Sequence, residues 1–145
     1  MANVSVYLNF AGNCEEAFNH YRQIFRGEFT FPFSYMRDMP GSDVASSLPE
    51  HEQGKVMHVG LSLFNGFQLM GCDMLESMGH KLVVGNNTVL NLELDSKEEA
   101  DRLYQALATQ SSECVAPQEQ FWGYWGVCID KFGIRWMFNV MNPTT

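Results

Sequence analysis

Hydrophobic and polar residues alternate strictly near the start of the chain. In residues 4–10 the even positions are apolar, whereas Ser5, Tyr7 and Asn9 occupy the odd positions. A period of two places successive side chains on opposite faces of a β-strand. The pattern therefore predicts a strand with one face in a core and a second, more polar face available for another role.

The same alternation returns near the end of the chain. In residues 121–140 two apolar, aromatic-rich runs flank residues 130–133, a pattern typical of a β-hairpin. Gly133 supplies the positive φ that such a turn needs, and the carboxylate of Asp130 is suited to capping it. Beyond the turn, Arg135, Met137 and Asn139 alternate with apolar residues, so they share one face of the last strand.

Two stretches combine a helix-capping pattern with an amphipathic stripe. Asn13 precedes Glu16 by three positions, and Ser96 precedes Glu99 in the same way. This spacing predicts a capping box at the start of each helix. Gly27 is expected to end the first helix.

The chain repeats its own pattern. The two helical stretches match with a constant offset, as Tyr21 and Tyr104 lie 83 residues apart. Further strands are expected at residues 28–36, 56–64, 67–73, 88–94 and 113–116. Pro32 indicates an edge or a bulge in the first of these strands. Asn65-Gly66 predicts a type I′ turn.

The order strand, helix, strand, strand, strand is thus written twice, which predicts an α+β fold of two βαβββ modules. The first module covers residues 1–75 and includes a long loop at 37–55. Residues 76–87 form a linker, and residues 88–145 form the second module of one structural domain. We expect the helix of each module to cover one face of its strands and the opposite faces to line a concave surface.

Charge and composition exclude several classes of protein. The net charge is −8, and the nine Lys and Arg residues are scattered singly, so nucleic acid is not an expected partner. No signal peptide and no apolar run long enough to cross a membrane is visible. The four cysteines form no CxxC pair and are expected to be reduced thiols. We therefore expect a cytoplasmic protein that has no membrane partner.

Several motifs in this order resemble one superfamily across nearly the whole chain. They are residues 7–13 leading into Glu16-Ala17, then Tyr21, His58, residues 118–123 and residues 130–136. The pattern is similar to the vicinal-oxygen-chelate superfamily, which includes glyoxalase I, bleomycin-resistance proteins and extradiol dioxygenases, and most closely to its PhnB-like branch. The resemblance implies a U-shaped mixed eight-stranded sheet with helices on its outer face and assembly as a homodimer.

Some members of this branch carry a demethylubiquinone-methyltransferase label. The sequence has no glycine-rich turn between a strand and a helix that is suited to hold S-adenosylmethionine. We therefore do not expect a methyltransferase.

Metal-dependent relatives of this kind bind a divalent ion through one residue from the first strand and one from the last strand of each module. The resemblance places these four positions at Ser5, Met70, Val89 and Met137. None of them is a usual ligand for such an ion, which prefers imidazole and carboxylate donors. We expect no metal at this site, while a divalent ion elsewhere stays open.

Two residues are candidates for acid–base chemistry. His58 falls on the predicted concave face, where a pKa near neutrality suits it to exchange protons. The alternative is a strand histidine that simply binds a neighbouring side chain. Glu93 lies on the corresponding face of the second module, and its alternative role is that of a solvated strand residue.

A second group is predicted to bind a ligand, because it combines amides, a phenol and a cation with apolar side chains. These residues are Tyr7, Asn9, Met70, Asn91, Trp125, Arg135 and Met137. Trp125 and its aromatic neighbours equally suit a dimer interface or a core.

The sequence therefore favours a protein that holds a small organic molecule in the concave cleft without the superfamily metal. The alternative is a lyase, isomerase or dioxygenase-type enzyme that uses a nonstandard metal site or metal-free acid–base chemistry. The identity of the ligand does not follow from these residues.

Overall fold

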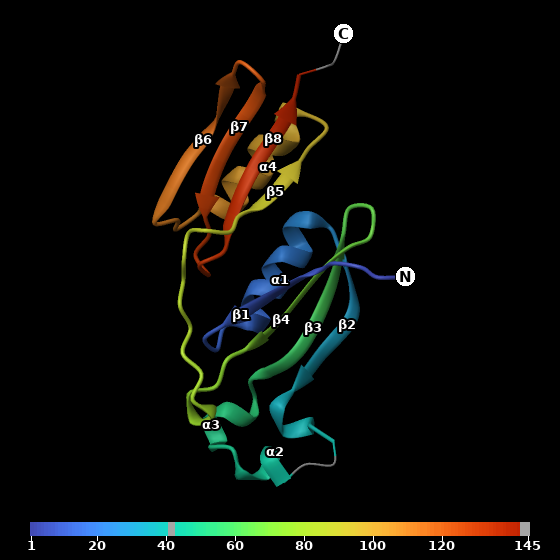
Figure 1. Ribbon diagram of the computed structural model, residues 1–145, viewed down its shortest axis with the longest axis vertical. Coiled ribbons are helices and arrows are strands. Elements are labelled where there is room, and N and C mark those ends of the chain that lie inside the picture. Colours follow the sequence, from blue (N-terminus) through green and yellow to red (C-terminus); the bar gives the residue numbers. More distant parts are fainter. Residues whose placement is uncertain (41–42, 143–145) are drawn as a thin grey trace. The chain divides into compact units, whose positions relative to one another are not determined.

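The computed structural model describes residues 1–40 and 43–142 (Figure 1). The chain divides into two compact units, Met1–Val83 and Val84–Thr145. The division falls within the predicted linker at 76–87. We call the two units the first and the second module.

Each module has the order strand, helix, strand, strand, strand. The first contains β1 (Val6–Phe10), α1 (Cys14–Phe25), β2 (Glu28–Tyr35), β3 (Val56–Leu63) and β4 (Phe67–Asp73). The second contains β5 (Leu90–Glu93), α4 (Lys97–Ala108), β6 (Glu113–Gln120), β7 (Gly123–Ile129) and β8 (Arg135–Met141).

The two sheets have the same topology. Their strand orders are β1-β4-β3-β2 and β5-β8-β7-β6. In each sheet the first strand runs parallel to the last, and the other neighbours are antiparallel. The predicted α+β fold of two βαβββ modules is confirmed, with eight strands in two mixed sheets among the described residues.

One face of each sheet is covered by the helix of the same module (Figure 1). In the first module Leu8, Phe10 and Leu69 are buried on the side of α1, as the alternation predicts. Tyr7 and Asn9 point to the other side and are exposed. We call the side of each sheet that faces away from its helix the open face.

Residues 37–55 contain more regular structure than the loop that the sequence predicts. Short helices are formed at η1 (Met36–Asp38), α2 (Asp43–Ser47) and α3 (Glu50–Gln53), and η2 (Glu76–Met78) follows β4. Met36, Leu48 and Leu75 bury one another in a small apolar cluster. These apolar residues are too sparse to show a helical period, which is why the sequence missed them. None of the helices in the described part of the chain is long and apolar enough to cross a membrane.

The strand predicted at residues 113–116 is too short, because β6 continues to Gln120. Its pairing with β7 shifts register between Val115 and Gln118. Pro117 lies in this interval and lacks the N–H that a regular ladder needs, so the strand continues through a bulge. Residues 118–120, which follow Pro117, are all polar and show no alternation, so the sequence did not predict a strand there.

The turn between β3 and β4 also differs from the prediction. The amide of Gly66 donates to the carbonyl of Leu63, so the turn spans residues 63–66. Phe64 and Gly66 have positive φ values of 50° and 91°, but Asn65 does not. A type I′ turn at Asn65-Gly66 would need positive φ at both residues, so that prediction was wrong.

The two helices start in different ways. At α4 the predicted cap is present, because Ser96 Oγ accepts from the amide of Glu99 at 3.2 Å. At α1 the side chain of Asn13 makes no capping bond. Asp73 at the end of β4 caps the helix instead, because its Oδ1 accepts from the amides of Gly12 and Cys14 at 2.9 and 3.0 Å.

The end of α1 lies one residue before the predicted Gly27. Arg26 adopts the left-handed conformation with φ of 54°. Gly27 is needed for a different reason, because a Cβ there would lie 2.5 Å from the backbone oxygen of Ser62 on β3. Because Gly27 has no side chain, the backbone can pass close to β3. The unfavourable left-handed conformation is adopted by Arg26 instead.

This division of roles predicts opposite effects for neighbouring substitutions. Arg26→Gly is expected to raise the free energy of unfolding by about 1 kcal/mol, since glycine adopts a left-handed conformation without strain. Gly27→Ala is expected to lower it by roughly 2 kcal/mol, since the backbone of β3 has to move. Urea unfolding of both variants measures the two values. A stabilising Gly27→Ala would contradict the explanation.

Candidate functional site

Tyr7 on β1 and His58 on β3 meet on the open face of the first sheet. The Tyr7 hydroxyl lies 3.0 Å from Nδ1 of His58, and the two rings stack with centroids 5.7 Å apart. Phe31 of β2 packs edge-on against the imidazole at 5.4 Å. These contacts hold the His58 ring between two aromatic side chains and fix its orientation.

The contacts continue from Tyr7 to Cys72 and Asn9. Cys72 lies on β4 and donates a hydrogen bond to Oδ1 of Asn9 at 3.5 Å. Burial, and after it the neighbouring Cys72, raises the pKa of Tyr7 to about 12. Burial also raises the pKa of the Cys72 thiol, although its hydrogen bond with Tyr7 opposes that shift. Both groups therefore stay protonated at neutral pH, even though the residue Tyr7 is 46% exposed.

The available protons limit the directions of these bonds. The carbonyl oxygen of Asn9 only accepts, so the one thiol proton of Cys72 goes there. The Tyr7 hydroxyl has one proton, which it donates either to Nδ1 of His58 or to the sulfur of Cys72. In the second case Nδ1 of His58 carries a proton and donates it to the Tyr7 oxygen.

The two arrangements correspond to the two tautomers of neutral His58. With the proton on Nδ1, the other ring nitrogen, Nε2, keeps its lone pair. No hydrogen bond to Nε2 arises within residues 1–40 and 43–142. In that tautomer the first module presents a hydrogen-bond acceptor on its open face, beside the ring of Phe31.

The second module places the corresponding strands in the same register. Asn91 on β5 lies opposite Met137 on β8, as Tyr7 lies opposite Met70 in the first module. Here the polar contact joins two amides, because Asn139 Nδ2 donates to Oδ1 of Asn91 at 2.6 Å. Both amides therefore already have a partner within the sheet.

Glu93 and Trp125 share the open face of the second sheet with this amide pair. Glu93 on β5 and Trp125 on β7 are each the register partner of Asn139 on β8. Glu93 is exposed, whereas Trp125 is half-buried and contacts the ring of Trp122. Glu93 lies in the second module and His58 in the first. A catalytic role for either residue stays a prediction.

Arg135 is engaged by its own module. Its Nε donates to the carbonyl of Gly85 at 3.1 Å, and its guanidinium pairs with Glu113 at 3.2 Å. The carboxylate partner of Arg135 is thus Glu113 on β6. This arrangement ties the segment before β5 to the sheet, and binding of a ligand by Arg135 stays a prediction.

The four positions at which the resemblance places metal ligands carry no suitable donors. They are a hydroxyl at Ser5, an aliphatic side chain at Val89 and thioethers at Met70 and Met137. Within the described residues, no three His, Cys, Asp or Glu side chains gather closely enough to hold a metal ion. The residues present do not fit the superfamily's divalent ion.

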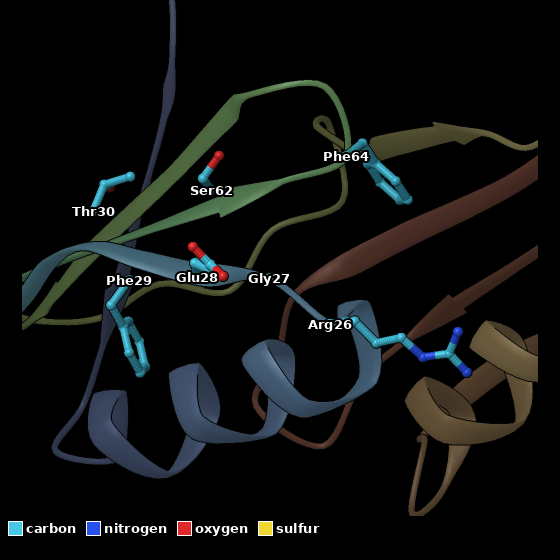
Figure 2. A pocket seen from close by; sticks show the side chains of 7 residues that line it. All are labelled: Arg26, Gly27, Glu28, Phe29, Thr30, Ser62 and Phe64. Atoms are coloured by element: carbon cyan, nitrogen blue, oxygen red, sulfur yellow. The ribbon is translucent and has the colours of Figure 1, made fainter.

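A polar cavity of about 390 Å³ lies at another part of the first module, where α1 passes into β2. Figure 2 shows Arg26 at the end of the helix, Phe64 in the turn after β3, and Thr30 and Ser62 on neighbouring strands. Tyr7 and His58 do not line it. The cavity surrounds the close passage at Gly27 and is separate from the Tyr7–His58 cluster.

Sequence reasoning did not single out two residues that the structure places beside the candidates. Phe31 reaches the open face because β2 shifts register between Phe29 and Phe31 and again beyond it. Pro32 predicted an irregularity in this strand, but it did not show which side chain the irregularity would bring to the open face. The alternation of β8 does place Asn139 on the open face, but it did not predict the hydrogen bond between Asn139 and Asn91.

The fold of two such modules defines a class of protein. A glyoxylase/bleomycin resistance protein/dioxygenase domain from Frankia has the same fold, with a TM-score of 0.63 at 12% identity over 98% of this chain and 99% of that domain. The chain therefore has the fold of the vicinal-oxygen-chelate superfamily. Within it, the chain belongs to the family described as 3-demethylubiquinone-9 3-methyltransferase, whose sequence profile matches residues 2–139.

Individual relatives cover nearly the whole chain. Protein YjdN of Escherichia coli is 32% identical over 96% of this chain and 95% of its own length. Protein PA1353 of Pseudomonas aeruginosa is 30% identical, with a TM-score of 0.83 over 99% of this chain and 100% of that one. A PhnB protein from Bacillus cereus is 23% identical, with a TM-score of 0.75 over 96% and 99%. The predicted membership of the PhnB-like branch is thereby confirmed.

The family description names a methyl transfer, which would require S-adenosylmethionine. Folds that bind such a nucleotide use free amides in a glycine-rich turn between a strand and a helix. Here the turn between β1 and α1 is closed, because Asp73 takes the amides of Gly12 and Cys14. The start of α4 is capped by Ser96, which accepts from the amide of Glu99. These residues do not fit that cofactor.

Proposed function

We propose that this protein binds a small, flat organic molecule that carries an O–H or N–H group, on the open face of the first module. The observation that supports the proposal is the contact between Tyr7 and His58, in which a proton on Nδ1 leaves Nε2 as an acceptor for the ligand. A ligand that donates to this nitrogen replaces water without leaving either group unpaired.

The surroundings of His58 suit the flat body of such a ligand. Phe31 is 51% exposed and lies edge-on to the imidazole. Met70, the register partner of Tyr7, adds a flexible thioether to the same face. One oriented polar group among apolar and aromatic side chains is the usual composition of a small-molecule site. We place the ligand against Phe31 and Met70.

The proposal includes a metal-free site, supported by the chemistry of the donors at Ser5, Met70, Val89 and Met137. It does not include methyl transfer, because Asp73 and Ser96 occupy the helix starts. A homodimer, which the family resemblance implies, and a cytoplasmic location both remain part of the proposal.

Two probes test the direction of the hydrogen bond. 4′-Hydroxyacetophenone carries an O–H donor, and 4′-methoxyacetophenone has the same ring and ketone without it. The wild-type protein is expected to bind the hydroxy probe about five- to tenfold more tightly, as one hydrogen bond of about 1 kcal/mol provides. In His58→Ala the two dissociation constants should become equal. Titration followed by ligand NMR measures both.

Three variants make the test specific. Tyr7→Phe should weaken the preference, because the His58 ring is then free to change tautomer. His58→Gln should keep part of it, since the amide oxygen also accepts. His51→Ala removes an exposed histidine of α3 and should change nothing. An unchanged preference in a folded His58→Ala protein would contradict the proposal.

The alternative function, an enzyme acting through the same histidine, has its own signatures. Elemental analysis of protein purified without chelator would reveal a stoichiometric divalent metal that disappears in His58→Ala. Proton NMR in D₂O would reveal exchange of the methyl protons of 4′-hydroxyacetophenone that depends on His58. Either result would replace the binding proposal with the enzyme.

A further inference from the structure

Two cysteines of the second module lie directly opposite one another. Cys114 on β6 and Cys128 on β7 are register partners in an antiparallel pair, and both are free thiols. The Cα atoms of such partners lie about 4.5–5.5 Å apart. A disulfide needs a Cα separation of about 4.4–6.8 Å. The backbone already provides the separation that a cross-link between these strands requires.

Both thiols lie on the side of the sheet that α4 covers. Burial, and then a hydrogen bond with Cys114, raises the pKa of Tyr104 on α4 to about 12, and Cys128 contributes to the same shift. Burial, Asp130 and then Cys114 raise the pKa of Cys128 to about 12. The two sulfur atoms are thus neighbours of each other and of Tyr104.

The two thiols differ in access. Cys114 is exposed, because β6 is the edge strand of its sheet. Cys128 is only 1% exposed. An oxidant in solution therefore reaches Cys114 first, and Cys128 is the thiol placed to react next.

We propose that Cys114 and Cys128 form a reversible cross-strand disulfide when the protein meets hydrogen peroxide. The Cys114 thiolate attacks one peroxide oxygen, the O–O bond breaks, and hydroxide leaves to give a sulfenic acid. The sulfur of Cys128 then attacks the sulfenic sulfur, an S–S bond forms, and the sulfenic hydroxyl leaves as water with the thiol proton of Cys128. One peroxide is reduced, and two thiols are oxidised.

The disulfide fastens the edge strand to the sheet. Beside Cys114, Glu113 holds Arg135 and Val115 lies opposite Val127. Cross-linking β6 to β7 restricts the unfolded chain, so the oxidised protein should unfold at a temperature roughly 5–10 °C higher, a shift that a thiol reductant reverses.

Mass spectrometry of the intact protein after treatment with hydrogen peroxide tests the proposal. The expected product is a monomer lighter by two hydrogen atoms, in which two of the four thiols no longer react with a maleimide. Peptide mapping should find the link between Cys114 and Cys128. In Cys128→Ser the sulfenic acid of Cys114 should persist and react with dimedone, whereas Cys114→Ser should form no disulfide.

Other outcomes overturn the proposal. They are a wild-type sulfenic or sulfinic acid at Cys114 without the cross-link, a link that involves Cys14 or Cys72, and dimers joined through Cys114. Circular dichroism of the two serine variants confirms that they are folded, and Cys72→Ser serves as the matched control that should still form the link.

Discussion

Asp73→Ala is expected to lower the free energy of unfolding by roughly 3–5 kcal/mol. The carboxylate is 3% exposed and accepts from the amides of Gly12, Cys14 and, at 2.9 Å, Val56. It therefore joins the start of α1, the start of β3 and the end of β4. Alanine leaves three backbone donors without their partner in a buried place. Urea denaturation measures the loss.

The control for this variant is Asp95→Ala, which removes an exposed carboxylate before α4 and should change the stability by less than about 0.5 kcal/mol. Asp73→Asn keeps one acceptor oxygen but turns an NH₂ group toward a backbone N–H, so an intermediate loss is expected. It also keeps the prediction testable if the alanine variant does not fold. An Asp73→Ala protein within about 1 kcal/mol of the wild type would contradict the assigned role.

Asp130→Ala is expected to cost about 3 kcal/mol by the same reasoning. Asp130 is 4% exposed, and its Oδ1 accepts from the amides of Phe132 and Ile134 at 2.9 and 3.0 Å. Its Oδ2 accepts from the indole Nε1 of Trp136 at 2.8 Å. The substitution removes both the cap of the β7–β8 turn and the partner of a buried tryptophan.

A second readout separates local from general damage in this variant. Hydrogen exchange of the Trp136 indole should become faster in Asp130→Ala, while the indoles of Trp122 and Trp125 should exchange as in the wild type. Equal changes at all three tryptophans would indicate general destabilisation and contradict the local role of Asp130.

The comparison of Asp73 with Asp130 explains which parts of the fold could be predicted from the sequence. Asp130 binds amides two and four residues away, so turn chemistry was enough to assign its role. Asp73 replaces a cap that the local sequence assigned to Asn13, and it does so from 59 residues away. Long-range contacts of this kind override a local capping pattern.

The end of α1 illustrates the same limit. A glycine after a helix usually takes the left-handed position. Here the close approach of β3 uses the absent Cβ of Gly27, and the left-handed residue is Arg26. Nothing in the local sequence distinguishes these two uses of one glycine.

Alternation along the strands correctly predicted that Tyr7, Asn9 and His58 would share the face opposite α1. It did not predict which atoms meet. The chain from Asn9 through Cys72 to His58 depends on the register between β1, β3 and β4, which alternation alone does not provide. The contact between Tyr7 and His58, on which the proposed acceptor Nε2 depends, became visible only with that register.

The most direct measurement is a long-range ¹⁵N–¹H NMR spectrum of the His58 ring at about pH 8. The expected spectrum shows the proton on Nδ1 and a lone pair on Nε2. Added 4′-hydroxyacetophenone should shift the Nε2 resonance, and 4′-methoxyacetophenone should not. A proton on Nε2 in the free protein, or a hydroxy probe that leaves the His58 resonances in place, would contradict the account.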